Sequence, residues 1–348
     1  MILIALILFF ISFFGTIYAM PRSIRKLTEN KYVVRDMYKL ERPNIPTNAG
    51  MILVFTSFIS ISLLPLISRF VPFIFDEHLP IADLSEENLA FLLVVSIFAL
   101  YGLVDDLVDI GRILKLVLPI TFSYPLISVV IPESIWIPLI GDYDLSSEIL
   151  MDVSRSDIFR VLIIPIYVMV VANLVNMHSG YNGLQSGLSL ILVFTLLLKS
   201  YQDGILDRII PAVSILGAIV AFYIYNKFPS KVFEGNIGSL FFGSTIGAII
   251  VIQEYWWFGF FILMPHTFNF LLWIIWLFLM RSNPDKYLDE TGNHTKFGEV
   301  GDDGTIIVPN ILTLKWMPNY YFGLNERNTV LALHGLTLMV CFTGIVIF

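Results

Sequence analysis

Ten apolar stretches, each long enough to cross or nearly cross a lipid bilayer, restrict what this sequence can fold into. They cover residues 1–20, 49–70, 89–104, 113–130, 158–176, 184–198, 209–225, 239–252, 258–280 and 329–348. A chain inside lipid must satisfy its own backbone polar groups, and segments of this length do so as helices. We therefore expect an all-α integral membrane protein of about ten transmembrane helices, forming a single polytopic membrane domain over residues 1–348.

The composition supports this class and excludes others. Charged residues make up 14% of the chain, whereas a soluble globular protein carries about a quarter. The net charge of -7 argues against a nucleic-acid partner, which would require a basic surface. The single cysteine, Cys341, cannot form an internal disulfide.

The basic residues predict how the chain is oriented. Arg22, Arg25 and Lys26 follow the first apolar stretch instead of preceding it, which is typical of an uncleaved span with its N-terminus outside. With ten spans both termini then lie outside. The odd-numbered connections hold sixteen Lys and Arg residues and the remainder of the chain holds five, so the positive-inside rule makes the odd connections cytoplasmic.

Carboxylates sit where the third apolar stretch ends, at Asp105, Asp106 and Asp109. Ionisable groups beside a membrane span are costly, and this makes them candidates for function. If the segment is helical, Asp105 and Asp109 share one face and Asp106 lies about 100° away. Gly111 is a candidate helix end, which would let Lys115 turn back toward a phosphate.

Two further inner connections carry amides, carboxylates and glycines. In the first, Asn173 and Asn176 are i, i+3 neighbours before a glycine-rich turn containing Gly180 and Asn182; the alternative is that both Asn side chains bond a neighbouring helix. The second, residues 226–238, contains two lysines that could simply contact anionic lipid. Its candidate site residues are Phe233, Glu234 and Asn236, with core packing as the alternative for Phe233.

These oxygen-bearing side chains suit a hard divalent cation. Mg²⁺ takes one or two protein oxygens together with water and substrate phosphates. Manganese could take its place. The few histidines and the lone cysteine do not form a zinc set.

The connection 281–328 is the longest polar stretch. Turn signals and a short strand over 305–308 predict a small mixed cytoplasmic region between the ninth and tenth helices, placed as a loop or cap over the site. Lys286 and His294 are its candidate substrate-binding residues, and solvated loop charges are the alternative.

Together these segments resemble the polyprenyl-phosphate N-acetylhexosamine-1-phosphate transferases, in particular the eukaryotic and archaeal branch that uses UDP-N-acetylglucosamine and dolichyl phosphate. The motifs are GLVDD at 102–106 with KL at 115–116, NLVN at 173–176 with GYNGL at 180–184, PSKVF at 229–233 with Gly235, and MPHTFNF at 264–270. Their order and spacing cover most of the chain.

The resemblance implies that a lipid phosphate attacks the β-phosphorus of the UDP-sugar and that UMP leaves, as the first lipid-linked step of protein N-glycosylation. Asp105 and Asp106 would match the family's paired acids and Lys115 its phosphate-binding lysine. It also implies an archaeal cell membrane or an endoplasmic reticulum membrane, with the site on the cytoplasmic face. A homodimer is left open.

The remaining roles concern the metal and the nucleotide. Asn176 would match a magnesium ligand, and Gly180, Asn182 and Phe233 would match the uridine pocket. Where the family has Gly-Asp as a magnesium-binding pair, this chain has Gly235 and Asn236, so the ligand is left open between Asn236 and Glu234. The arginine-rich signature of the eukaryotic branch is absent; Lys286 and His294 are the nearest substitutes.

Two alternatives remain. One is a sister transferase that uses another UDP-sugar or lipid phosphate, because nothing in the sequence identifies the sugar. The other is a cation-coupled transporter that uses the acidic cluster, although transporter sites usually lie near the bilayer midplane between internal repeats. No P-loop motif supports an ATP-driven pump.

Overall fold

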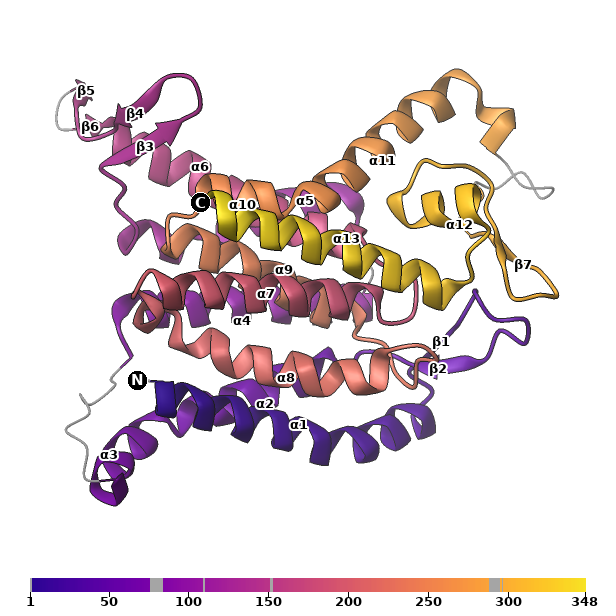
Figure 1. Ribbon diagram of the computed structural model, residues 1–348, viewed down its shortest axis with the longest axis horizontal. Coiled ribbons are helices and arrows are strands. Elements are labelled where there is room, and N and C mark those ends of the chain that lie inside the picture. Colours follow the sequence, from indigo (N-terminus) through magenta and orange to yellow (C-terminus); the bar gives the residue numbers. More distant parts are fainter. Residues whose placement is uncertain (1, 76–83, 109, 151–152, 288–294, 296) are drawn as a thin grey trace.

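The apolar stretches form helices that lie side by side in one bundle (Figure 1). The structure is a computed structural model that describes residues 2–75, 84–108, 110–150, 153–287, 295 and 297–348. The longer helices are α1 (Ile2–Glu29), α2 (Gly50–Ser62), α3 (Leu64–Phe75), α4 (Glu86–Val108), α6 (Arg155–Met177), α7 (Leu184–Gln202), α8 (Ile210–Asn226), α9 (Gly235–Ile252), α11 (Met264–Ser282) and α13 (Glu326–Ile347).

The predicted all-α membrane class is confirmed. Within the described residues, eight helical segments are long and apolar enough to cross a membrane, and a ninth is added if α10 (Trp256–Ile262) and α11, which meet at 66°, count as one span. The predicted span 113–130 forms instead α5 (Arg112–Phe122) and the 3₁₀ helix η1 (Tyr124–Ser128). Pro125, at the start of η1, lacks the backbone N–H that a continuous helix would need there, whereas α5 continues through Pro119 to Phe122. The count of ten therefore stays a prediction.

The two ends of the bundle carry different small elements. The start of α1 and the end of α13 lie at one end (Figure 1), together with the antiparallel hairpins of β3 (Ser134–Ile137) with β4 (Gly141–Asp144) and β5 (Glu148–Leu150) with β6 (Val153–Ser154). The 3₁₀ helix η2 (Leu206–Ile209) leads into α8. That this end faces outside stays a prediction from the basic residues.

The opposite end carries two pieces that flank the candidate site. β1 (Val33–Arg35) pairs with β2 (Asn44–Pro46) in the connection between α1 and α2. The connection 281–328 contains η3 (Pro284–Tyr287), η4 (Leu314–Trp316) and α12 (Met317–Phe322), with β7 (Glu299–Val300) paired antiparallel to β8 (Ile306–Ile307). The predicted short strand and the mixed character of this region are confirmed.

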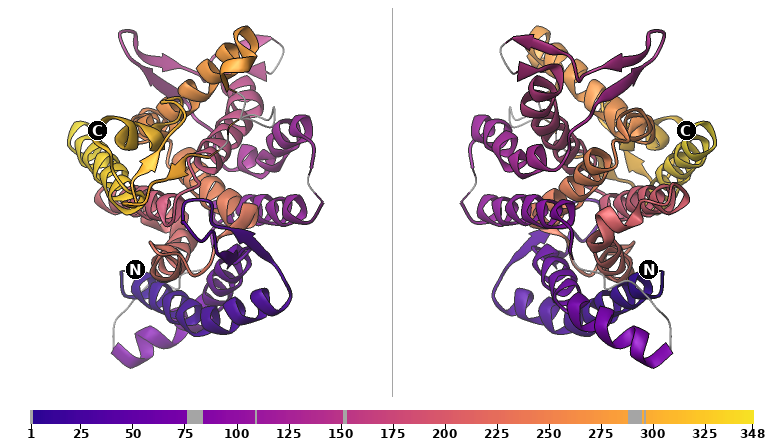
Figure 2. Two further views of the ribbon diagram at one scale, coloured as in Figure 1. Left: turned by 90° about the vertical axis from the view of Figure 1, so that its right-hand side faces the viewer. Right: turned by 90° about the vertical axis from the view of Figure 1, so that its left-hand side faces the viewer.

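Helix α9 is the centre of the bundle, and the views along the helices in Figure 2 show other helices around it. All of its residues from Ile237 to Ile252 are buried, and it packs against α4, α6, α2 and α7. Small residues allow the close approach: a Cβ on Gly102 of α4 would lie 2.5 Å from the carbonyl oxygen of Asn236. The end of α4 is thereby held against the first turn of α9.

Candidate active site

The aspartate pair at the end of α4 meets the start of α9. Asp106 accepts hydrogen bonds from the backbone N–H of Asn236 (3.0 Å) and of Ile237 (3.2 Å). The first N–H groups of a helix have no partner within it, and the helix dipole favours a carboxylate there. Asp106 therefore caps α9 from a neighbouring helix and fixes the position of its first turn.

Asp105 has different partners, as its place on another face of α4 predicts. Its carboxylate accepts from the Asn236 side-chain amide (2.9 Å) and from the backbone of Ile110 (3.0 Å), and it pairs with the Lys115 ammonium at 2.8 Å. Gly111 precedes α5 and does not end α4, which runs to Val108; the turn brings Lys115 back to Asp105, and its contact with phosphate stays a prediction. Asp105 is 7% exposed, whereas about a third of the Lys115 side chain is exposed. Asp109 lies outside the described residues.

A cavity of about 400 Å³ opens beside this pair. Seven residues predicted from the sequence are among those that line it: Asp106, Asn176, Gly180, Asn182, Phe233, Glu234 and Asn236. They come from α4, the end of α6, the turn before α7 and the loop before α9. Segments separated by 130 positions are thus brought to one place. Asp105 and Lys115 are not among the lining residues: Asp105 bonds the lining residue Asn236, and Lys115 pairs with Asp105.

The cavity contains oxygen atoms that suit Mg²⁺. The Asn236 amide donates its N–H to Asp105, which leaves its oxygen without a donor among the described residues. One Glu234 oxygen accepts from Asn226 at 3.1 Å, and the side-chain oxygen of Asn176 has no donor within the described part of the chain. Burial raises the pKa of Glu234 to about 7. Amide and carboxylate oxygens are ligands of the kind that Mg²⁺ takes together with water and phosphate, and all three residues line the same cavity.

Asn182 is held by three bonds. Its side chain donates to Asp36 (3.0 Å) and accepts from the backbone of Ser230 (2.8 Å), and its own N–H donates to Glu326 (2.7 Å). Asn182 is buried. These bonds join the α6–α7 turn to three other segments, so Asn182 organises the wall on which Gly180 and Phe233 also lie.

Two candidates do not line the cavity, and a third cannot be placed because it lies outside the described residues. Asn173 donates to the Met169 carbonyl in its own helix and does not line the cavity. Lys286 is exposed on η3, with its ammonium 6.0 Å from the Tyr287 ring centroid. Among the described lining residues Lys286 does not occur. His294 lies outside the described residues.

Several lining residues were missed by the sequence analysis. Arg35, Asp36 and Tyr38 come from the α1–α2 connection. Gln185 accepts from Ser239 at 2.8 Å and so links α7 to α9 at the floor of the cavity. The charge density of residues 31–42 was a signal for the first group, but charge alone does not say that a loop folds back over the bundle.

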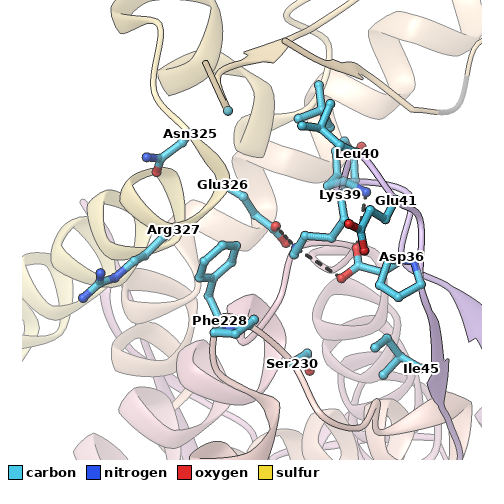
Figure 3. A pocket seen from close by; sticks show the side chains of 15 residues that line it. Asp36, Lys39, Leu40, Glu41, Ile45, Phe228, Ser230, Asn325, Glu326 and Arg327 are labelled. Carbon is cyan, nitrogen blue, oxygen red and sulfur yellow. Dashed lines mark hydrogen bonds and ion pairs between the residues drawn. The ribbon is translucent and has the colours of Figure 1, made fainter. Parts of the chain in front are cut away.

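A second cavity, of about 610 Å³, is lined by Asp36, Lys39, Phe228 and Glu326 among others (Figure 3). It shares Asp36 and Tyr38 with the first cavity. Lys39 pairs with Asp36 at 3.1 Å and also with Glu326. Its ammonium lies 4.6 Å from the centroid of the Phe228 ring. Asp36 and Glu326, which hold Asn182, are therefore themselves bridged by one lysine.

Comparison with known proteins gives consistent results. The model of glycosyl transferase family 4 matches residues 88–254, a range that includes the site from Asp105 to Asn236. A protein of Saccharolobus solfataricus is 31% identical over 70% of this chain and 68% of its own length, and one of Sulfolobus acidocaldarius is 30% identical over 68% of each. Both are provisionally named UDP-N-acetylglucosamine–dolichyl-phosphate N-acetylglucosaminephosphotransferase. A phospho-N-acetylmuramoyl-pentapeptide-transferase of Bacillus pumilus is 26% identical over 62% of this chain and 63% of its own.

Proposed function

This chain belongs to glycosyl transferase family 4, and from that membership we propose that it transfers N-acetylglucosamine 1-phosphate from UDP-N-acetylglucosamine to a dolichyl-type polyprenyl phosphate. The observation that carries the proposal is the shared cavity, because residues expected from the sequence to hold the metal, the uridine and the phosphates line it or adjoin it. The names of the two archaeal relatives support the choice of substrates.

In this reaction an oxygen of the lipid phosphate forms a bond to the β-phosphorus of the nucleotide-sugar. The bond from that phosphorus to the oxygen shared with the α-phosphate breaks, and UMP leaves with the electron pair. A phosphomonoester is already anionic at neutral pH, so no strong base is required. Phosphoryl transfer depends mainly on positioning and on stabilising the spreading negative charge.

The residues of this chain then have distinct tasks. Lys115 is partly exposed and held by Asp105, which in turn bonds the lining residue Asn236, and it would supply a positive charge to the substrate phosphates. Asp106 keeps the first turn of α9 in place. Phe233 offers a ring on which uracil can stack.

Asn176, Asn236 and Glu234 would hold Mg²⁺, or Mn²⁺ in its place. When bound, the cation would neutralise charge on the diphosphate. We place this site at the cytoplasmic face, because it lies at the end of the bundle that carries most of the Lys and Arg residues.

The test uses purified full-length protein in detergent with UDP-N-acetylglucosamine, dolichyl phosphate and Mg²⁺. We expect UMP in amounts equal to the glycolipid formed, and no UMP without the lipid phosphate or in EDTA. If UMP appears only with UDP-N-acetylmuramoyl-pentapeptide or another UDP-sugar, the proposed donor is wrong and a sister transferase is identified. No turnover with any such donor would remove the transferase proposal.

A further inference from the structure

One cation beside the cavity has no part in the chemistry proposed above. Lys315 lies on η4, in the connection 281–328, and its ammonium donates to the Ser179 carbonyl at 3.0 Å. It also lies 5.3 Å and 5.6 Å from the ring centroids of Tyr181 and Tyr38. Ser179, Tyr181 and Tyr38 all line the cavity, so the ammonium lies directly behind its wall.

The Lys315 ammonium has more N–H donors than the described residues have acceptors for it. A lysine carries three N–H bonds, and the described residues provide one hydrogen-bond acceptor. No carboxylate of the described chain lies within ion-pair distance, in contrast to Lys39 and Lys115. Removing a charge from water without a counter-charge is unfavourable, and burial accordingly lowers the pKa of Lys315 to about 8.

The fold does not need this charge to hold η4 in place. The Thr313 hydroxyl (3.0 Å) and the Leu314 N–H (2.9 Å) both donate to the Asn269 side chain on α11. On the other side, Tyr181 donates to Asn319 at 2.8 Å, and Trp316 is buried. An apolar side chain at position 315 would pack between the two tyrosines at a lower desolvation cost.

Gly180 connects the ammonium to the cavity. It has φ +103°, and a Cβ on it would collide with the Lys315 ammonium. The bare α-carbon therefore leaves the charge facing an exposed turn of the cavity wall. The flexible four-carbon stem of a lysine lets its two remaining donors reach a ligand that lies against this turn.

We propose that Lys315 is a phosphate-binding residue of the donor site, where it contacts the diphosphate of the nucleotide-sugar lying along Gly180. This inference rests on the proposed use of a UDP-sugar. It gives the connection 281–328 a direct part in substrate binding through a residue other than Lys286 and His294. Lysine binds phosphate as a point charge, and its own desolvation cost is offset when an anion arrives.

The experiment measures equilibrium binding of UDP and of uridine to the full-length protein in detergent with Mg²⁺. For Lys315→Met we expect the dissociation constant of UDP to rise at least tenfold and that of uridine to stay within twofold, because uridine has no phosphate. Lys315→Arg should recover most of the UDP affinity. Lys26→Met, which removes an exposed lysine from the last turn of α1, is the matched control and should bind both ligands normally.

Other outcomes would overturn the inference. Equal weakening of UDP and uridine in Lys315→Met would mean that the lysine only shapes the wall, and unchanged UDP affinity would mean that it does not reach the diphosphate. A raised KM for dolichyl phosphate with normal UDP affinity would assign the charge to the acceptor instead. Lys315→Gln provides a second variant if the methionine protein unfolds, with thermal unfolding as the check.

The same data separate this inference from the proposed function. If the wild-type protein binds UDP through Lys315 but transfers nothing to dolichyl phosphate, the proposed reaction fails and the phosphate contact stands. If transfer proceeds while Lys315→Met binds UDP normally, only the inference fails.

Discussion

At the scale of single residues, neighbouring groups of one chemical type have separate tasks because their partners differ. Asp106 uses both oxygens to cap α9, whereas Asp105 pairs with an ammonium and an amide. Adjacent positions on a helix point about 100° apart, so one dipeptide serves two neighbours. The predictions for substitutions follow from these partners.

For the Asp105–Lys115 pair, we expect Lys115→Ala and Asp105→Asn each to lower UMP release at least about 100-fold, because a charge-stabilising group at the transferring phosphate is lost or misplaced. Both changes should also lower stability, by about 1–3 kcal/mol, because Asp105 is buried and either loses its counter-charge or turns an amide group toward the Asn236 and Ile110 donors. Initial rates and thermal unfolding measure the two effects. A rate within twofold of wild type would exclude the substituted residue from the site.

For Asn236→Asp, the structure refines the expectation from the family pattern. In wild type the Asn236 amide nitrogen lies 2.9 Å from the Asp105 carboxylate, and a carboxylate at position 236 would repel it. We therefore expect the free energy of unfolding to fall by about 1–3 kcal/mol in EDTA. Mg²⁺ should restore stability and keep activity strictly metal-dependent. Thermal unfolding over a range of Mg²⁺ concentrations tests this, with Asn283→Asp on the exposed end of α11 as control. Collapse of activity at saturating Mg²⁺ would mean that Glu234 or another group coordinates the ion.

The pH dependence of UDP binding follows from Lys315. Burial lowers the pKa of Lys315 to about 8, so its side chain carries a positive charge below that pH and loses this charge above it. Of the groups facing it, burial raises the pKa values of Tyr38 and Tyr181 and lowers that of His178, while the charge of Glu326 favours the ammonium. Glu234 has a pKa of about 7 and gains charge as the pH rises through 7, which favours the cation, so the loss of UDP affinity should begin only above about pH 8, where Lys315 loses its charge. Lys315→Arg should remove the fall, and an identical fall in both proteins would assign it elsewhere.

At the scale of elements, the contact between α4 and α9 decides whether the site exists. Gly102 lies against the backbone of Asn236, so the distance between the two helices at this point is set by a missing side chain. The same contact aligns both aspartates with the first turn of α9. A change in helix separation should therefore affect stability and catalysis together.

The test is Gly102→Ala against Gly111→Ala. A methyl group at Gly102 would lie 2.5 Å from the Asn236 carbonyl oxygen and 2.7 Å from its carbon, both rigid backbone atoms, whereas at Gly111 nothing lies within 4 Å in the described chain. We expect Gly102→Ala to cost about 1–3 kcal/mol and most of the activity, and Gly111→Ala to be nearly neutral. Thermal unfolding and UMP release check both. Equal behaviour of the two variants would contradict this account of the helix contact.

At the scale of the whole molecule, the two ends of the bundle differ in function. The cavities described above lie at the end that carries β1, β2 and α12, and the β3–β4 hairpin lies at the other (Figure 1). Because the one cysteine, Cys341, is buried, the orientation can be tested by adding single cysteines to the native chain.

We expect a membrane-impermeant maleimide to label Ile140→Cys, at the exposed tip of the β3–β4 hairpin, in intact cells. Lys231→Cys, exposed at the site end, should be labelled only after permeabilisation. The wild-type protein is the background control. The reverse pattern would invert the orientation and place the site outside.

Much of this protein was predictable from local patterns. Hydropathy alone indicated the membrane class. A backbone in lipid must satisfy its own hydrogen bonds, and apolar segments of this length do so as helices. Motif chemistry indicated Asp106, Asn176, Gly180, Asn182, Phe233, Glu234 and Asn236, which the structure places around one cavity. It did not distinguish them from Asn173 or Lys286, because periodicity says which face a residue occupies but not what packs against that face.

The sequence by itself determined that polar groups lie beside helix ends. Only the tertiary structure decided that Asp106 caps α9 from another helix, that residues 35–38 fold over the cavity, and that Lys315 lies behind Gly180. The reason is physical. Hydropathy and helical periodicity depend on near neighbours in the chain, whereas these contacts join residues more than one hundred positions apart and depend on how closely bare glycine surfaces let helices and loops approach.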